Sequence, residues 1–152
     1  MRTLRQLGTT IDRMLPKSNR LNNKCIKNMI KLYSGTDWKD VVKYENIVKK
    51  NDNFIKFKYP VEFNNLQLQV VKWNTNNTDR IDDCAKSMYY INRSLYGNIL
   101  CYIHNEDDKL SKITALSRTD VNCFDTMKGY HLFRNIGDHT AYSLHMFSAK
   151  GT

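Results

Sequence analysis

The sequence predicts a mainly β fold with helices confined to the N-terminal third. Apolar residues change their spacing near residue 53. Before it they recur at helical spacing, and after it they alternate in short runs separated by Asn, Asp and Gly. The chain has 152 residues, 41% of them hydrophobic, which is enough for the core of one domain. We therefore expect a single domain, with a helical part over residues 1–50 and a β-barrel over 53–148.

Three helical segments are predicted in the N-terminal part, at residues 10–15, 21–33 and 38–48. The second has an apolar face from Ile26 to Tyr33 and ends before Gly35, a residue type that is common at helix C-termini. Thr36 and Asp37 are candidate N-terminal caps of the third helix.

A short helix at the N-terminus would carry Arg2, Arg5 and Arg13 opposite an apolar face that includes Leu7 and Ile11. A basic, acid-poor helix at this position resembles a mitochondrial presequence. An ordinary helix packed on the domain has the same apolar spacing, so both interpretations stay open. We expect an intracellular protein, either mitochondrial or cytoplasmic.

Eight short strands are predicted after residue 53, at residues 54–59, 66–73, 88–95, 99–104, 113–116, 121–124, 131–135 and 142–147. In one of them Leu66, Leu68 and Val70 alternate with Gln67, Gln69 and Val71, as expected of a strand whose side chains point alternately to two faces. Many short strands joined by turns, without intervening helices, predict an all-β barrel or sandwich. We expect a cupin-type double-stranded β-barrel, or jelly roll, with N-terminal helices.

The chain is basic, with 24 Lys and Arg against 15 Asp and Glu and a formal net charge of +9. Such a charge favours an acidic partner: RNA, an anionic membrane or an acidic protein surface. The lysines between residues 17 and 58 follow no single helix face in the sequence, which is typical of a solvated surface. No apolar run approaches the roughly 20 residues of a membrane-spanning helix, so no transmembrane segment is expected.

Four cysteines, Cys25, Cys84, Cys101 and Cys123, are widely spaced and form no CxxC pair. This spacing excludes zinc-ribbon and thioredoxin-like motifs and indicates free thiols. The sequence also contains no Ser-His-Asp elbow, phosphate loop or Gly-rich nucleotide motif. Catalysis by those arrangements is therefore not indicated.

Two stretches near the C-terminus, GYHLFRN at residues 129–135 and AYSLHMFS at 141–148, contain His131 and His145. They resemble the metal-site region of the cysteine dioxygenase family, in which a Gly-x-His strand is followed by a Ser-Leu-His-x-Tyr-Ser strand. The upstream stretches MIKLYSGTDW, LQLQVVKW and LYGNIL occur in the family's order and at similar distances. The resemblance therefore covers nearly the whole chain.

The resemblance implies a site built around one non-haem iron ion held by three histidines. His131 matches the third ligand, whereas the first two ligand positions fall at Asp82 and Cys84. Ser143 and His145, which match residues that adjoin the ligands in the family, are retained. A lone imidazole binds a divalent metal too weakly to keep it, so no cofactor is expected.

Other positions of the family pattern are changed as well. The arginine that binds the substrate carboxylate aligns with Lys58, the site cysteine falls near Tyr89, and the tyrosine cross-linked to that cysteine is Phe147 here, while Trp73 is retained. We therefore expect a catalytically degenerate cysteine dioxygenase-like protein that acts as a structural or interaction subunit of a larger protein complex. The vestigial site residues would be Ser143, His145 and Phe147.

Two alternatives stay open. Asp82, Cys84 and His131 could form an altered iron site in an active thiol dioxygenase, because Asp-x-Cys on a strand puts both side chains on one face. The basic surface could instead make the chain an RNA-binding module, since phosphate contacts supply much of the affinity for nucleic acid.

The histidines also have purely structural explanations. A hydrogen bond to Ser143 inside a barrel would account for His145 without catalysis. His139, within Gly-Asp-His-Thr, is expected to be exposed in a turn, and His104 begins an acidic turn.

Overall fold

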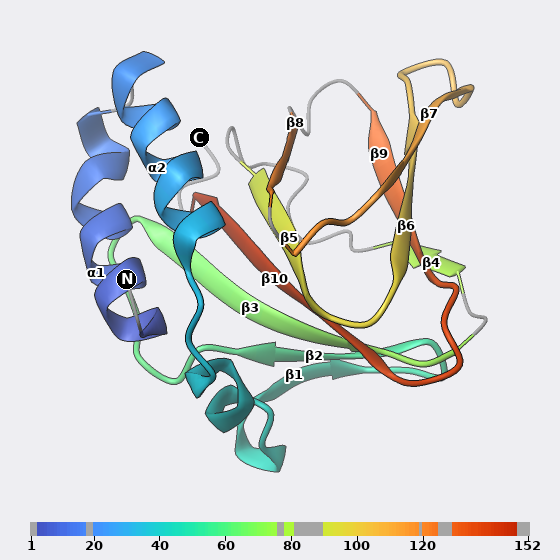
Figure 1. Cartoon of the computed structure of the whole chain (residues 1–152), viewed down its shortest axis with the longest axis horizontal. Coiled ribbons are helices and arrows are strands. Elements are labelled where there is room, and N and C mark those ends of the chain that lie inside the picture. Colours follow the sequence, from blue (N-terminus) through green and yellow to red (C-terminus); the bar gives the residue numbers. More distant parts are fainter. Residues whose placement is uncertain are drawn as a thin grey trace.

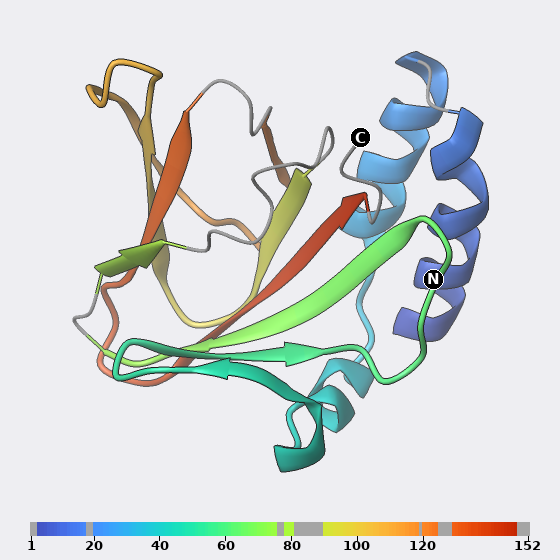
Figure 2. The ribbon, with the colours of Figure 1, turned by 180° about the vertical axis from the view of Figure 1, so that it is seen from behind.

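Two α-helices, three short 3-10 helices and two antiparallel β-sheets form the described part of the chain (Figure 1, Figure 2). The computed structural model describes residues 3–17, 20–75, 78–80, 90–118, 120–124 and 129–148. The α-helices lie together on one side, and the strands fold into a barrel beside them. The predicted jelly roll with N-terminal helices is confirmed.

The helical part is α1 (Leu4–Met14), η1 (Leu15–Lys17), α2 (Arg20–Leu32), η2 (Asp37–Val41) and η3 (Tyr44–Asn46). α1 begins after Thr3, whose hydroxyl accepts a hydrogen bond from the backbone N–H of Gln6 at 3.1 Å. Its apolar face, formed by Leu4, Leu7 and Ile11, is buried in the core. The N-terminal segment is thus a packed helix, as one of the two interpretations predicted, and the compartment stays a prediction.

The prediction of a helix over residues 38–48 is wrong. The segment forms η2 and η3 and then strand β1 (Ile47–Lys50). Thr36 makes no capping hydrogen bond with its side chain. Asp37 accepts hydrogen bonds from the backbone N–H of Leu4 at 2.7 Å and from the hydroxyl of Tyr33 at 2.6 Å, so it joins the start of α1 to the end of α2. Four β-branched residues in the segment also favour extended backbone over helix.

The larger sheet has six strands in the order β1-β2-β3-β10-β5-β8. After β1 these are β2 (Phe54–Lys58), β3 (Leu66–Trp73), β10 (Ala141–Ser148), β5 (Tyr90–Tyr96) and β8 (Asn122–Phe124). The smaller sheet has the order β4-β9-β6-β7, with β4 (Thr78–Arg80), β9 (Tyr130–Asn135), β6 (Ile99–His104) and β7 (Leu110–Ala115). β1 and β4 were not predicted, because β1 overlaps the segment expected to be helical and β4 has only three residues, all polar.

The alternation predicted for residues 66–73 divides the larger sheet into two faces. Leu68 and Val70 of β3 point outward and belong to the same buried cluster as Ile30 of α2. Val71 and Trp73 of the same strand point into the barrel and belong to a second cluster. Within the described residues, we find no helix with the length and apolar character needed to cross a membrane.

Arg93 of β5 ties the end of α2 to the larger sheet. Its Nη1 donates to the carbonyl of Ile30 at 2.8 Å, to that of Tyr33 at 2.7 Å and, at 3.3 Å, to that of Lys31. The arginine is buried and lies over the ring of Tyr33, 5.9 Å from its centroid. The last carbonyls of a helix have no partner within it, so this cation satisfies groups that the helix leaves open.

Candidate functional site

Ser143 and His145 lie two residues apart on β10 and face the inside of the barrel, next to Trp73 of β3. The indole Nε1–H of Trp73 donates to Ser143 Oγ at 2.8 Å, and that oxygen lies 2.5 Å from His145 Nε2. All three side chains are completely buried. Since an indole can only donate, the serine hydroxyl accepts from Trp73 and keeps its own proton and one lone pair for His145. Trp73, Ser143 and His145 therefore form one hydrogen-bonded chain.

The imidazole of His145 is neutral at physiological pH. Burial, reinforced by the charge of Lys56, lowers the pKa of His145 to about 3. Lys56 of β2 is completely buried and pairs with Val71, so it faces the barrel. His145 can therefore form hydrogen bonds near neutral pH but does not act there as a cationic acid.

Two buried amides flank His145 across the larger sheet. The register places Gln69 of β3 and Asn92 of β5 directly opposite His145. Asn92 is completely buried, and in the described structure neither atom of its amide, nor Gln69 Oε1, has a hydrogen-bond partner. Buried amides normally bond to protein, water or ligand. Gln69, His145 and Asn92 therefore form a buried polar row across the larger sheet.

His131 lies on β9 of the smaller sheet and also faces inward. It pairs with Ile103 of β6 and is buried. Burial, followed by the proximity of His104, lowers the pKa of His131 to about 3. The ring centroid of Phe133 lies 6.3 Å from that of His131 and 5.5 Å from that of His145. The two histidines that match the family thus pair with the same phenylalanine from opposite sheets.

The iron ion that the family resemblance implies would need further ligands beside His131. In residues 3–17, 20–75, 78–80, 90–118, 120–124 and 129–148, no three His, Cys, Asp or Glu side chains come close enough together to hold a metal. Asp82 and Cys84, the partners of His131 in the predicted altered site, lie outside the described residues, as does Tyr89. The altered site stays a prediction.

Two lysines of β2 are candidates for the position of the family's arginine. Lys58, which the sequence suggested, is exposed at the end of the strand, whereas Lys56 is completely buried. Both side chains point to the same side because they are two residues apart, so the sequence pattern could not separate them. Phe147, at the position of the cross-linked tyrosine, is buried inside the barrel.

The remaining histidines lie away from this interior. His139 is exposed in the turn before β10, as predicted. His104, at the end of β6, stacks on Tyr130 with a centroid distance of 4.7 Å and an angle of 1° between the rings. The hydroxyl of Tyr130 donates to Asp108, so this cluster joins β9 to the acidic turn.

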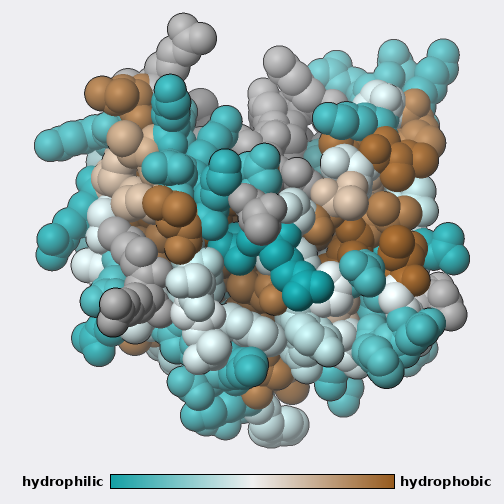
Figure 3. All heavy atoms as spheres, viewed as in Figure 1, coloured by the Kyte–Doolittle hydropathy of each residue, from teal (hydrophilic) through white to brown (hydrophobic). Residues whose placement is uncertain are grey.

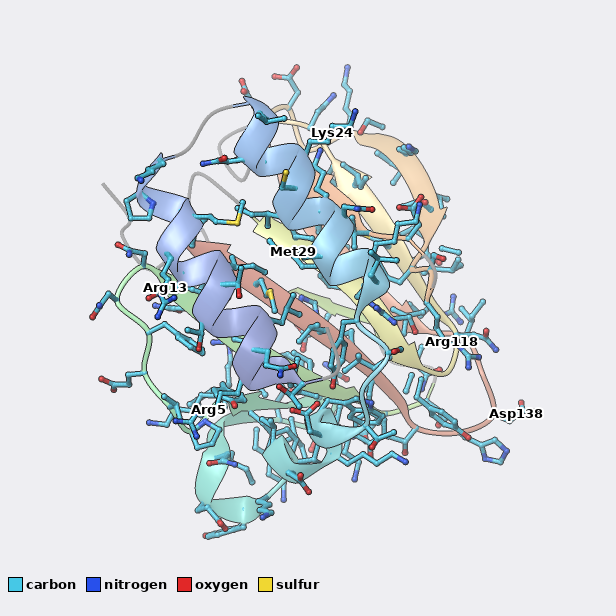
Figure 4. All side chains as sticks on the ribbon, turned by 60° about the vertical axis from the view of Figure 1, so that its left-hand side comes forward. Arg5, Arg13, Lys24, Met29, Arg118 and Asp138 are labelled. Atoms are coloured by element: carbon cyan, nitrogen blue, oxygen red, sulfur yellow. The ribbon has the colours of Figure 1, made fainter. Side chains whose placement is uncertain are left out.

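A cavity of about 840 Å³ lies between α2 and the inner face of the smaller sheet. Lys24, Lys27 and Lys31 of α2 line it together with Lys112 of β7 and the buried His131. Figure 4 labels Lys24 near the start of α2 and shows the helix beside the strands. The prediction that these lysines follow no single helix face is wrong for α2, because spacings of three and four residues bring them to one side of the helix, although all three are exposed as expected of a solvated surface.

The outer face of the smaller sheet carries an apolar patch that none of the described helices covers. Leu132 of β9 and Ile113 of β7 both lie opposite Tyr102 of β6, and Leu100 is on the same face. Ile113 is 51% exposed, and the other three are half-buried. Figure 3 shows apolar surface on the right-hand side, over the strands that Figure 1 labels β6, β7 and β9. We call these four residues the outer patch.

No family model matches the sequence, and no curated protein matches it. Several solved structures resemble the fold. The Cnp3 cupin domain of Schizosaccharomyces pombe has a TM-score of 0.50 and 12% identity, and the match covers 72% of this chain and 70% of that one. The protein TT1209 from Thermus thermophilus has a TM-score of 0.53 and 13% identity, with 74% and 94% covered.

The oxalate decarboxylase of Lactobacillus farciminis, solved as a formate complex, has a TM-score of 0.52 and 14% identity. That match covers 65% of this chain but only 30% of the decarboxylase, and the chain spans 44% of an oxalate oxidase that it also matches. At such identities the likeness concerns the fold and not the chemistry. Together with the sheet order, it shows that the chain has a cupin-type jelly-roll fold.

Proposed function

We propose that this cupin-fold chain is a divergent relative of the cysteine dioxygenases that has lost iron-dependent thiol oxidation and serves as an interaction subunit of a larger protein assembly. The relationship rests on the residues that resemble the family. Trp73, Ser143 and His145 form one hydrogen-bonded chain, and His131 faces the same interior from the other sheet. Such convergence is expected if the family's site has been partly kept.

The loss of catalysis is supported by what has replaced the rest of that site. The sequence has Asp82 and Cys84 where two of the three histidine ligands would stand. Phe147 is buried at the position of the cross-linked tyrosine and has no hydroxyl group.

The outer patch is the observation that carries the interaction role. Tyr102 lies at its centre with Leu132 and Ile113 on either side, and aromatic residues at the centre of an apolar patch commonly dominate binding to another protein. Arg134 lies beside Leu100 on this face, and the chain has a net charge of +9. These charges favour a protein partner whose contact surface has an apolar centre and an acidic rim.

A pair of double variants tests the interaction role. Ile113→Lys with Leu132→Lys charges the outer patch, whereas Leu32→Lys with Val48→Lys makes the same kind of change at two exposed positions elsewhere. We expect a protein partner to co-purify in stoichiometric amount with the tagged wild type and the control, from the cells that naturally make the chain, and to be lost from the patch variant. A partner that the patch variant retains would rule out this surface.

A separate assay tests the loss of catalysis. Purified protein supplied with Fe²⁺ and cysteine should show no oxygen consumption above that of free iron, and elemental analysis should find iron far below one ion per chain. Stoichiometric iron that disappears in His131→Ala, together with thiol oxidation, would contradict the proposal and establish the altered site with Asp82 and Cys84 instead.

A further inference from the structure

The cavity between α2 and the smaller sheet is basic. Lys24, Lys27, Lys31 and Lys112 line it, and Asp120 is the only acid among its described lining residues. Like charges three and four residues apart on a helix repel each other and destabilise it. A negatively charged ligand on this wall would relieve that repulsion.

The lysine row of α2 is held in a fixed position relative to the barrel. Ile26 and Ile30, on the other side of the helix, are buried in the core, and Arg93 binds the carbonyls at its end. From Lys24 to Lys31 the backbone rises by about 10 Å, since each helical residue adds about 1.5 Å. The row therefore presents several cations along a length greater than that of one carboxylate or one phosphate group.

The rest of the cavity wall is largely uncharged. Leu21, Ile103 and Val121 supply apolar surface, and His131 is neutral because burial lowers its pKa to about 3. Burial also raises the pKa of the Cys101 thiol to about 12, so this residue is not a nucleophile near neutral pH. The volume of about 840 Å³ lies within the range of roughly 300 to 1,000 Å³ that is usual for small-molecule sites.

We propose that this cavity binds a phosphorylated small molecule with several negative charges, of the size and type of a nucleoside polyphosphate. Its phosphate groups lie along the lysine row of α2, and its uncharged part lies on the apolar wall. A single-stranded nucleic acid would also need aromatic side chains along the basic groove, on which its bases stack, and the described lining of this cavity contains no Phe, Tyr or Trp. The inference does not depend on the proposed interaction role.

Cys25 provides a readout on the unmodified chain, because it lines the cavity and its side chain is exposed. We expect ATP to slow the alkylation of Cys25, measured on its peptide by mass spectrometry, with a saturable dependence on ATP concentration. An absence of protection up to millimolar ATP would overturn the proposal. Protection by a single-stranded RNA oligonucleotide but not by ATP would also overturn it, and would support the RNA-binding alternative.

Matched variants locate the site. The triple variant Lys24→Gln, Lys27→Gln and Lys31→Gln and the control Lys43→Gln, Lys50→Gln and Lys109→Gln both lower the formal charge from +9 to +6. ATP affinity, measured by calorimetry, should fall at least about tenfold in the first and less than about threefold in the second, because charge-assisted hydrogen bonds to phosphate are strong and local. Equal losses in both would show that general charge, and not this cavity, attracts the ligand, and would overturn the proposal.

Discussion

The two sheets of the barrel follow the same alternation of apolar residues, yet among the described residues helices cover the outer face of the larger sheet only. Leu144 of β10 is 1% exposed in the cluster that includes α1 and α2. Leu132 of β9, at a comparable outward position in the smaller sheet, is half-buried. Ile113, on the same face of that sheet in β7, is 51% exposed. Alternation therefore defines which side chains share a face, and separate packing decides what covers that face.

The apolar residues on the outer faces of the two sheets therefore have different roles. In the larger sheet they stabilise the fold by packing against the helices. In the smaller sheet the outer patch keeps part of its surface in water, and this is why we propose that it contacts a partner. The three predictions below compare equivalent changes in the two sheets.

The largest difference is expected for Leu144→Ala against Leu132→Ala. The first opens a cavity in a fully buried cluster and should lower the free energy of unfolding by about 2 to 5 kcal/mol. The second should cost less than about 1 kcal/mol, because the side chain is already partly solvated. Urea denaturation of the isolated chain measures both. Equal losses would mean that the outer patch is part of the core.

Acid should destabilise the protein through one histidine in each sheet. The pKa of His145 and that of His131 are both lowered to about 3 in the folded state. Between pH 6.5 and 3 the unfolded chain therefore binds protons that the folded chain does not, and stability falls as the pH is lowered. The loss is at most about 1.4 kcal/mol per pH unit for each histidine.

Single-residue variants test whether these two histidines cause the loss of stability in acid. His145→Gln and His131→Gln should each flatten the decline in unfolding free energy between pH 6.5 and 4.5, measured by denaturation at each pH. His139→Gln, in which the replaced side chain is exposed, should leave the slope as in the wild type. A slope that is the same in all three variants would contradict the assignment.

The smallest effect is expected for the same serine change in the two sheets. Ser143→Ala removes the hydroxyl that joins Trp73 to His145 and leaves both buried groups without that hydrogen-bond partner. We therefore expect the free energy of unfolding to fall by about 1 to 3 kcal/mol. Ser111 of β7 donates to the carbonyl of Ile103 at 3.1 Å but is exposed, so Ser111→Ala should change stability by less than about 0.5 kcal/mol. Thermal and urea unfolding measure both variants, and a loss in Ser111→Ala as large as that in Ser143→Ala would contradict this prediction.

The sequence was informative where local pattern decides structure. The strand at residues 66–73 is confirmed because its alternation is strict, and the shared face of Ser143 and His145 follows from their spacing of two. The helix expected over 38–48 did not form: its four β-branched residues disfavour helix, and the bonds of Asp37 to Leu4 and Tyr33 are not visible in the sequence pattern.

Features that need two distant segments could not be predicted in this way. Lys56 and Lys58 lie on the same face of one strand, and the sequence does not show that Lys56 is buried whereas Lys58 is exposed. The α2 lysines could have been recognised as one row, but the wall that faces them comes from β6, β7 and β9, at least 70 residues later in the chain. Sequence periodicity does not show which distant segments come into contact.

The hydrogen bonds from Arg93 to the end of α2 affect the order in which the chain folds. The helix is synthesised well before the strand that binds it, since Arg93 follows Ile30 by 63 positions. Until β5 is in place, the last turn of α2 lacks this partner and should fray, and the long loop between them makes closure slow. We therefore expect hydrogen exchange during refolding to show the last turn of α2 gaining protection together with β5, later than the first turns of the helix.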